Sequence, residues 1–487
     1  MLLVTALMVS IMAAVDMTIV SVALPYMAGN LNASPDEITW VVTMFTCGQA
    51  LVIGVTGHLS RLLGRKRLAI IVVIGFVGSS MACGFAQSLT QIVIFRFVQG
   101  IFSGPLIPLS QSMLVDAFPP EERNKALSVW AMGVLGGPAL GPIIGGWLAQ
   151  HLDWRWNFFV NLPVGIIALF LILTFVRKVP RQKVRTDLVG LVLLAVWVVG
   201  LQILLDQGNN SDWFDAVEIQ VLGILFVTFL TAFVLRGIVV GDANIIKLRL
   251  FADTNFLACS LMVSLIGSIF LGSLIMTPQL LIDYMKWEVV TAGVVMGVAG
   301  AFGVLGSLLA GRLDKLLGIR RMAVLSSVFM SAGWFLYSRL NSDAGPMDVI
   351  VPQAMIMFGM MLVFPLLAAQ AFLNLRPDER DEGAGLFNFV KTLGFSFGVT
   401  FVGVMLYRGA PANWTRYVGD ISTVNPVFTQ LLDGPVFGGD LSFAAVVAAD
   451  ALSRQSGILA ITQTAQVLMM ITLVTMPLAL LLQTRRG

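Results

Sequence analysis

The stretch LLVTALMVSIMAAVDMTIVSVALP, residues 2–25, decides the fold class, because it is a long apolar run that holds a single charged residue, Asp16. A helix of about 20 apolar residues crosses the hydrocarbon core of a bilayer. No basic residue precedes the run. We therefore expect it to stay as a first membrane span and not to be removed as a signal peptide.

The rest of the chain has the same character. Of its 487 residues, 57% are hydrophobic and only 12% are charged, whereas soluble domains carry about 25% charged residues. Helices are expected in the spans, because lipid leaves no partner for free backbone polar groups. We predict fourteen spans, at residues 2–25, 38–58, 68–87, 89–112, 126–149, 157–176, 188–206, 217–236, 256–281, 289–310, 322–340, 348–373, 383–407 and 458–482.

The distribution of basic residues predicts the orientation. With the N-terminus in the cytoplasm, the boundaries on the cytoplasmic side hold 22 of the 30 Lys and Arg residues, as the positive-inside rule requires. Both termini are then cytoplasmic. The net charge of +3 reflects this bias, and it gives no reason to expect nucleic acid binding. The three cysteines fall in predicted spans and indicate no disulfide framework.

An internal repeat divides the chain. GHLSRLLGRKR (57–67) returns as GRLDKLLGIRR (311–321), and PEER (120–123) returns as PDER (377–380). Both pairs are eight predicted spans apart, although basic glycine-containing turns also recur by chance. The period predicts two parallel six-helix halves, a build typical of secondary transporters. The predicted units are a six-helix bundle at 1–178, an inserted helix pair at 179–240 and a six-helix bundle at 241–487.

One long segment lies outside the predicted spans, at residues 408–457. We expect an external loop with plain loop structure there. The alternatives are that it packs on the external mouth of the protein or docks a partner.

Four motifs carry a family resemblance. They are VDMTIVSVALP (15–25), IFRFVQGIFSGPLIPLSQ (94–111), LGGPALGPIIGGWL (135–148) and DWRWNFFVNLPVG (153–165). Together they resemble the fourteen-span drug:proton antiporters (EmrB/QacA type) of the major facilitator superfamily. The resemblance implies an all-α integral membrane protein with two six-helix bundles and two inserted helices.

The loop after the second span departs from the superfamily's usual pattern, G-x-L-x-D-R-x-G-R. The motif here contains Gly57, Arg61, Gly64 and Arg65, so an arginine occupies the acidic position. The carboxylate contact that helps to lock the cytoplasmic side of the family is therefore not expected in its usual polarity.

The fifth predicted span has the character of a helix that packs closely and bends. Small residues four apart allow close helix approach, and prolines remove backbone hydrogen bonds. The resemblance implies a flexible helix at the interface of the halves, and static tight packing is the alternative. The residues concerned are Gly137, Pro138, Gly141, Pro142, Gly145 and Gly146.

Three charged residues lie well inside the predicted spans: Asp16, Arg96 and Lys391. Such charges are costly in a bilayer and are functional candidates. Counted along their helices, Asp16 and Arg96 lie at similar depth below the external surface. We predict that they pair and that Asp16 binds the coupling proton. A purely structural ion pair is the alternative.

The same reasoning yields candidates for a substrate cavity. Gln99 lies one turn beyond Arg96, and Lys391 lies beside Asn388 in GLFNFVKTLG. Lys391 either lines the cavity or extends its ammonium to the cytoplasmic interface. Met357 and Phe364, in AMIMFGMMLVF, are predicted to give a soft cavity lining, with core or lipid contact as the alternative.

The predicted function is transport. The sequence has no phosphate-binding loop, and its two histidines are predicted on opposite sides of the membrane, so we expect no enzyme, metal or cofactor. We predict proton-coupled efflux of small amphipathic drugs by alternating access across the inner (cytoplasmic) membrane. The alternative is a proton-coupled carrier for a defined metabolite such as an amino acid, fatty acid or siderophore. In a double-membrane cell, the resemblance implies a periplasmic adaptor protein and an outer-membrane channel.

Overall fold

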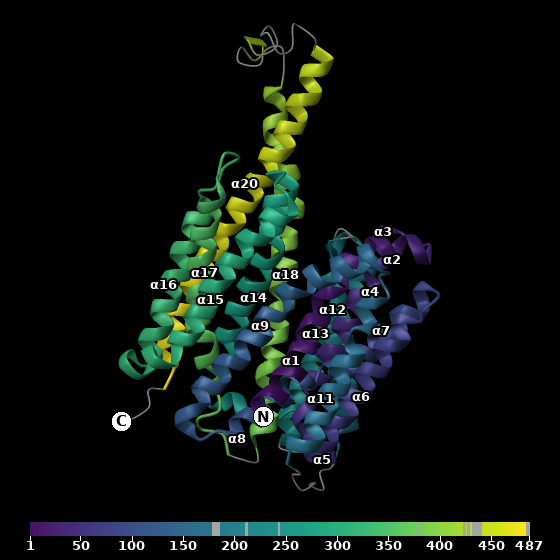
Figure 1. Cartoon of the computed structure of the whole chain (residues 1–487), viewed down its shortest axis with the longest axis vertical. Helices are drawn as coiled ribbons and strands as arrows, with labels where there is room; N and C mark the ends of the chain where they lie inside the picture. Colours follow the sequence, from purple (N-terminus) through teal and green to yellow (C-terminus); the bar gives the residue numbers. More distant parts are fainter. Residues whose placement is uncertain are drawn as a thin grey trace.

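The computed structural model describes residues 1–177, 186–209, 213–241, 244–376, 379–421, 425, 429–430 and 441–483. Throughout these residues the regular structure is helical, and long helices run side by side along the molecule (Figure 1). Eleven described helices are long and apolar enough to cross a membrane, or twelve if the bent pair α4 and α5 is one span. The all-α membrane class is confirmed, and the number fourteen stays a prediction.

Six helical segments form the N-terminal bundle, in which α1 packs on α9 and α11, and α4 packs on α7. They are α1 (Leu2–Ile19) continued by α2 (Leu24–Leu31), α4 (Trp40–Ile53) with α5 (Thr56–Leu63), α6 (Arg65–Gly84), α7 (Leu89–Ser103) with α8 (Leu106–Ala117), α9 (Pro120–His151) and α11 (Asn161–Phe175).

Six more form the C-terminal bundle, in which α15 and α16 pack on α17, and α14 packs on α18. They are α14 (Thr254–Pro278), α15 (Val289–Leu317), α16 (Ile319–Tyr337), α17 (Pro346–Gln370), α18 (Arg380–Tyr417) and α20 (Leu441–Leu478). The residue limits predicted for the bundles remain predictions.

The inserted pair consists of α12 (Leu188–Gln207) and α13 (Val217–Val240). α12 touches both halves, through α4 and α18, whereas α13 packs on α12 and is otherwise largely exposed. An ion pair joins the pair at one end, where Arg236 Nη2 lies 2.7 Å from Asp187 Oδ1. Hydrogen bonds from Arg236 hold the pKa of the Asp187 carboxyl below its usual value. The two inserted helices are thus joined to each other and lie beside the interface of the halves.

The repeat seen in the sequence has a counterpart in the backbone. Gly64 and Gly318 occupy equivalent positions in the two copies of the motif, and each connects two helices with a positive φ, +83° and +76°. Only glycine adopts such a conformation without strain. Pro377 and Asp378, in the second pair of repeated motifs, lie outside the described residues.

The predicted external loop at 408–457 is wrong over much of its length. Residues 408–417 continue α18, and residues 441–457 belong to α20. The two helices pack as an antiparallel hairpin that projects beyond the other helices (Figure 1). Asn413 Nδ2 donates to Gln463 Oε1 at 3.3 Å across this hairpin. The DGPVFGGD segment, 433–440, lies outside the described residues.

Candidate functional site

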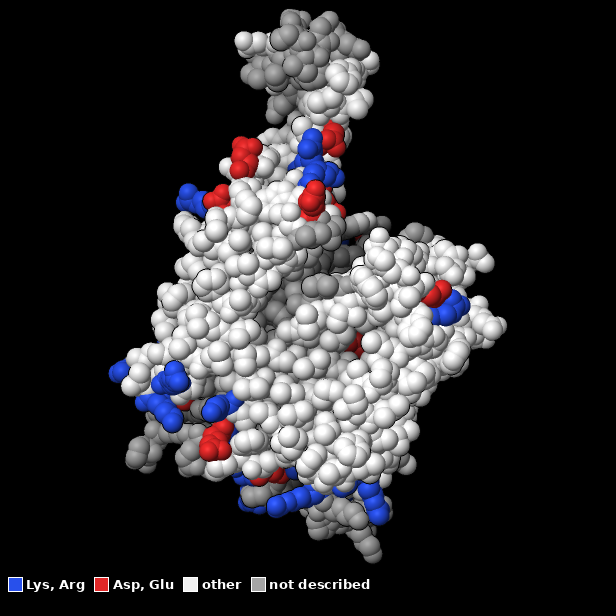
Figure 2. Space-filling view, viewed as in Figure 1, with Lys and Arg blue, Asp and Glu red and all other residues white. Residues whose placement is uncertain are grey.

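A cavity of about 480 Å³ lies between the two halves, with walls from α1, α4, α12, α14 and α18. The surface is visibly hollowed between the halves, below the projecting hairpin (Figure 2). The lining of the cavity is mostly apolar, with polar groups on α4, α12 and α18. Such a mixture suits small amphipathic molecules.

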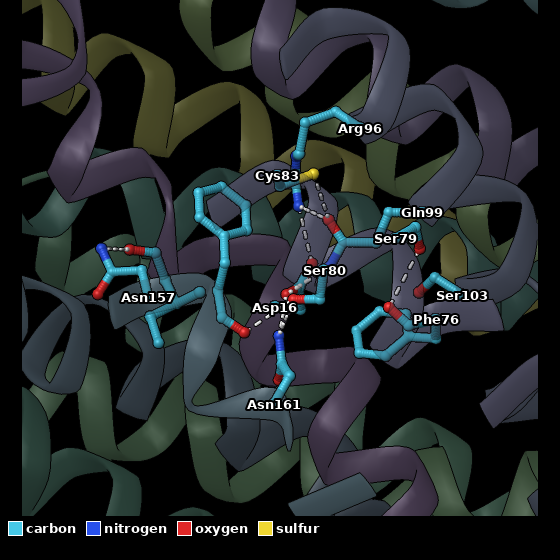
Figure 3. A network of polar contacts seen from close by, with 12 residues as sticks. Asp16, Phe76, Ser79, Ser80, Cys83, Arg96, Gln99, Ser103, Asn157 and Asn161 are labelled. Carbon is cyan, nitrogen blue, oxygen red and sulfur yellow. Dashed lines mark hydrogen bonds and ion pairs between the residues drawn. The ribbon is translucent and has the colours of Figure 1, made fainter. Parts of the chain in front are cut away.

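A buried network surrounds Asp16, which is 1% exposed (Figure 3). Arg96 Nη1 donates to Asp16 Oδ2 at 2.9 Å. Gln99 Nε2 and Asn161 Nδ2 both donate to Oδ1, at 3.0 and 2.7 Å. The carboxylate of α1 is thus held by donors from α7 and α11, in the way that a charge at bilayer depth requires.

The guanidinium of Arg96 is equally enclosed. Arg96 is 0% exposed, donates from Nε to the Val41 carbonyl at 3.2 Å, and lies 4.0 Å above the centre of the Phe45 ring. Its Nη2 is buried without a hydrogen-bond partner among the described residues. The structure therefore brings Asp16 and Arg96 together, as the depth argument predicted.

This network lies behind the cavity wall and not on it. Ala14, Met17 and Thr18 of α1 line the cavity, whereas Asp16 faces the interior of the N-terminal bundle. The predicted place of Gln99 on the cavity wall is corrected: it is 0% exposed and bonded to Asp16 and Arg96. Which face of a helix meets the cavity depends on packing, and depth alone does not determine it.

On the C-terminal side, Lys391 of α18 lines the cavity. Its Nζ donates to Asn388 Oδ1 at 2.6 Å, and Lys391 is only 3% exposed, so its ammonium does not extend to an interface. Asn388 in turn donates to Gln111 of α8. The Asn388 side chain lies beneath the wall and connects Lys391 to the other half.

Met357 and Phe364 of α17 do not line this cavity. Met357 packs against Gly303 of α15, and Phe364 is 1% exposed in the hydrophobic core. The alternative of core contact describes both residues. Their apolar character fits both a cavity wall and a hydrophobic core, so composition alone does not distinguish these two environments.

Ion pairs close the end of the molecule where α1 begins. Arg61 pairs with Glu382, and Lys247 Nζ lies 2.5 Å from the other Glu382 oxygen. Arg65 Nη2 lies 2.5 Å from Asp381 Oδ1. The bases of the α5–α6 motif thus meet acids at the start of α18. We call this group (Arg61, Arg65, Lys247, Asp381, Glu382) the basal lock.

The basal lock has the polarity that Arg61 requires, with the base in the N-terminal half and the acid in the C-terminal half. Asp381 and Glu382 were not among the predicted site residues, although the DE that follows PDER was a visible signal. Gly57 lets the halves approach there, because a Cβ on it would lie 2.3 Å from the Glu382 Cα. The motif residues therefore sit at the contact between the halves.

The glycine face of α9 lies against α1. A Cβ on Gly141 would lie 2.1 Å from Thr18 Oγ1, and one on Gly145 would lie 2.3 Å from the Ile19 carbonyl oxygen. Gly137 faces Ala14, whereas Gly146 has only an ordinary contact. α9 also packs on α15 and α17 of the other half. Pro142 is exposed, and the Pro138 side chain lies outside the described residues.

Asp206 of α12 also lines the cavity, which corrects the statement that only three charges lie well inside the spans. The seventh predicted span ends at this residue, so the sequence places Asp206 at a span boundary. The helix continues to Gln207, and Thr46 Oγ1 of α4 donates to Asp206 Oδ2 at 3.3 Å. Polar residues at 202 and 206, four apart in an apolar helix, were the available signal.

Comparisons with known proteins agree with this architecture. Residues 6–399 match the family model described as Major Facilitator Superfamily. The chain is 34% identical over 419 residues to the multidrug export protein EmrB of Haemophilus influenzae, covering 85% of this chain and 82% of the relative. It is also 34% identical to the fatty acid resistance protein FarB of Neisseria gonorrhoeae, covering 84% and 81%.

Solved structures show the same fold at low sequence identity. The human organic anion transporter MFSD10 gives a TM-score of 0.59 at 13% identity, with 98% of both chains covered. The proton:xylose symporter XylE gives 0.58 at 14% identity, with 94% of both chains covered. By the family model and by these relatives, the chain belongs to the major facilitator superfamily.

Proposed function

We propose that this multi-pass membrane protein is a proton-coupled multidrug efflux transporter that exports amphipathic compounds across the cell inner membrane by alternating access. Its similarity to EmrB of Haemophilus influenzae and to the EmrB and EmrY proteins of Escherichia coli, at 33–34% identity, supports multidrug export. The cavity between the halves and the basal lock support an outward-facing state of such a cycle. The superfamily consists of transporters, and no enzyme reaction is proposed.

The observation that carries proton coupling is the Asp16–Arg96 pair. A carboxylate sealed from the cavity but attached to a cavity-lining helix can gain or lose a proton as α1 moves. Burial favours the neutral form of a carboxyl and a neighbouring guanidinium favours the charged form. A small change in the geometry of the pair therefore favours binding or release of the proton.

The test uses purified protein in liposomes with an imposed pH gradient. Asp16→Asn is expected to abolish gradient-driven flux of a fluorescent amphipathic drug. Because this substitution leaves Arg96 unpaired, the neutral pair Asp16→Asn with Arg96→Gln is assayed beside it. Asp343→Asn, which changes an exposed acid between α16 and α17, is the control and should transport normally. Normal flux through folded Asp16→Asn protein would contradict the proton role.

A proton-coupled carrier for one metabolite is the second candidate, and a fatty acid is the cargo that the structure favours. Lys391 places on the cavity wall an amine that can carry a positive charge, and FarB is named for fatty acid resistance. Flux of a single fatty acid with no flux of several unrelated drugs would establish this alternative.

In a double-membrane cell, we propose a periplasmic adaptor protein and an outer-membrane channel as partners, as the motif resemblance implies.

A further inference from the structure

The inserted helix α12 brings two hydrogen-bond acceptors to the central cavity. Asp206 and Gln202 both line it, and they lie four residues apart, on one face of the helix. Gln202 is 1% exposed, and its Oε1 atom is buried without a hydrogen-bond partner among the described residues. Two neighbouring acceptors thus face the same space.

Asp206 has no charged partner in the described part of the chain. Its hydrogen-bond donors are the Thr43 and Thr46 hydroxyls of α4, and no ion pair joins it to a described Lys or Arg. By contrast, Asp16 has a guanidinium and two amide donors. A carboxylate within a membrane-spanning helix is costly without a compensating positive charge, and a buried acceptor without a donor is costly as well.

The other charge on the cavity wall does not supply that compensation. Of the described lining residues, Lys391 is the one basic residue, and it is bonded to Asn388 on α18. The remainder of the wall is largely apolar, with Phe270, Leu274, Ile275 and Phe395 among its members. The group that fits beside Asp206 is therefore a cation attached to an apolar body.

We propose that Asp206 and Gln202 form a binding subsite for lipophilic organic cations, with the positive charge at Asp206 and an N–H of the ligand on Gln202 Oε1. The subsite deepens, and rests on, the proposed multidrug transport. It gives the inserted pair a direct role in substrate recognition in addition to its packing beside the two halves.

Binding of two ions of equal shape and opposite charge tests the proposal. Tetraphenylphosphonium and tetraphenylborate are titrated into purified full-length protein in detergent. Asp206→Asn is expected to weaken tetraphenylphosphonium binding about tenfold, because the phosphonium loses the attraction of a carboxylate beside it. Tetraphenylborate binding should stay the same or tighten.

Two further variants make the result specific. Asp206→Glu keeps the charge and should retain binding of tetraphenylphosphonium. Asp215→Asn, at an exposed acid in the connection between α12 and α13, should bind like the unchanged protein. Equal tetraphenylphosphonium affinity in Asp206→Asn would overturn the subsite, and so would an equal loss for both ions, which would indicate a structural role.

Gln202 is tested with a ligand that has N–H donors. Gln202→Leu should weaken binding of a phenylalkylammonium ion several-fold and leave tetraphenylphosphonium, which has no donor, unchanged. An unchanged ammonium affinity would remove Gln202 from the subsite. The proposed function fails on separate grounds: gradient-driven drug flux that persists in Asp16→Asn contradicts proton coupling, whatever Asp206 binds.

Discussion

Asp16 shows how a single carboxylate is tolerated inside an apolar bundle. Three side chains, from Arg96, Gln99 and Asn161, donate to its two oxygens. The depth argument predicted only the arginine, because it considered charged residues alone. The two amides were visible in the quoted motifs, but their direction depends on how α7 and α11 are rotated, and packing decides that rotation.

The same pair predicts a stability effect at the residue scale. Arg96→Gln leaves the buried Asp16 carboxylate without its countercharge and should lower the free energy of unfolding by about 3–5 kcal/mol. Adding Asp16→Asn to that variant should restore most of the loss, because no buried charge remains. Thermal unfolding in detergent, followed for both single variants and the double variant, measures the coupling. Additive losses in the double variant would contradict a direct interaction.

Lys391 and Asp206 mark the limit of prediction for single side chains. The sequence identifies Lys391 as a charge inside a span but does not fix its direction, since its four-carbon chain reaches either the cavity or the cytoplasmic interface. The position of Asp206 on the cavity wall is not predicted by hydropathy, because an apolar window is ended at the first charged residue. A charge that lies in the last turn of a helix yet faces a cavity has no signature in such a window.

At the scale of helices, the close contact between α1 and α9, called the seam below, depends on glycines of α9, which have no side chain. The Gly145 backbone lies so close to Ile19 that a methyl group would overlap its carbonyl oxygen, whereas Gly136 of the same helix has open space at its Cβ position. Spacing predicted the close approach, but not which helix would be the neighbour.

The contrast within α9 gives a matched pair of variants. Gly145→Ala should lower thermal stability and slow transport, since α1 and α9 must separate or shift to admit the methyl group. Gly136→Ala should be neutral or slightly stabilising, by up to about 1 kcal/mol, because alanine favours a helix. Unfolding midpoints and flux in liposomes provide the measurement. Equal effects at both positions would show that the seam is not tightly packed.

The helices at 408–417 and 441–457 could not be predicted from hydropathy, for a physical reason. Hydropathy identifies segments that are apolar enough to lie in lipid, and it does not show whether a helix continues beyond the membrane. The ends of α18 and α20 are held by contacts with each other, such as that of Asn413 with Gln463. A fold of this kind needs pair contacts that a single-sequence pattern does not contain.

At the scale of the whole molecule, the two halves meet through the basal lock at the end that we place in the cytoplasm. The repeat in the sequence predicted two similar halves, and the altered motif at Arg61 predicted an unusual lock. The acids that complete it come from α18, more than three hundred residues later in the chain. Complementary charges so distant in sequence are identified by the folded structure.

The basal lock predicts a change in cavity access. Glu382→Gln leaves Arg61 and Lys247 without their shared carboxylate, so the closed arrangement should weaken and the cytoplasmic side should open more often. In an Ile53→Cys background, at the cavity wall, labelling from the cytoplasmic side should rise about tenfold, equivalent to ~1.4 kcal/mol. The three native cysteines are buried and should contribute little background.

Glu379→Gln is the matched control for this experiment. Glu379 lies three residues earlier, and its ion pair with Arg249 stays within the C-terminal half. Its labelling should equal that of the unchanged lock. Similar increases for both glutamates would point to general loosening of α18 and would contradict a specific lock.

The hairpin of α18 and α20 has a mechanical consequence. α20 contains 38 residues, so it is about 57 Å long, well beyond the roughly 30 Å of a hydrocarbon core. The end of a stiff arm travels farther than its base when the base rotates. In the proposed alternating-access cycle, rocking of the C-terminal half would therefore move the projecting ends of α18 and α20 sideways through a larger arc than any cavity wall.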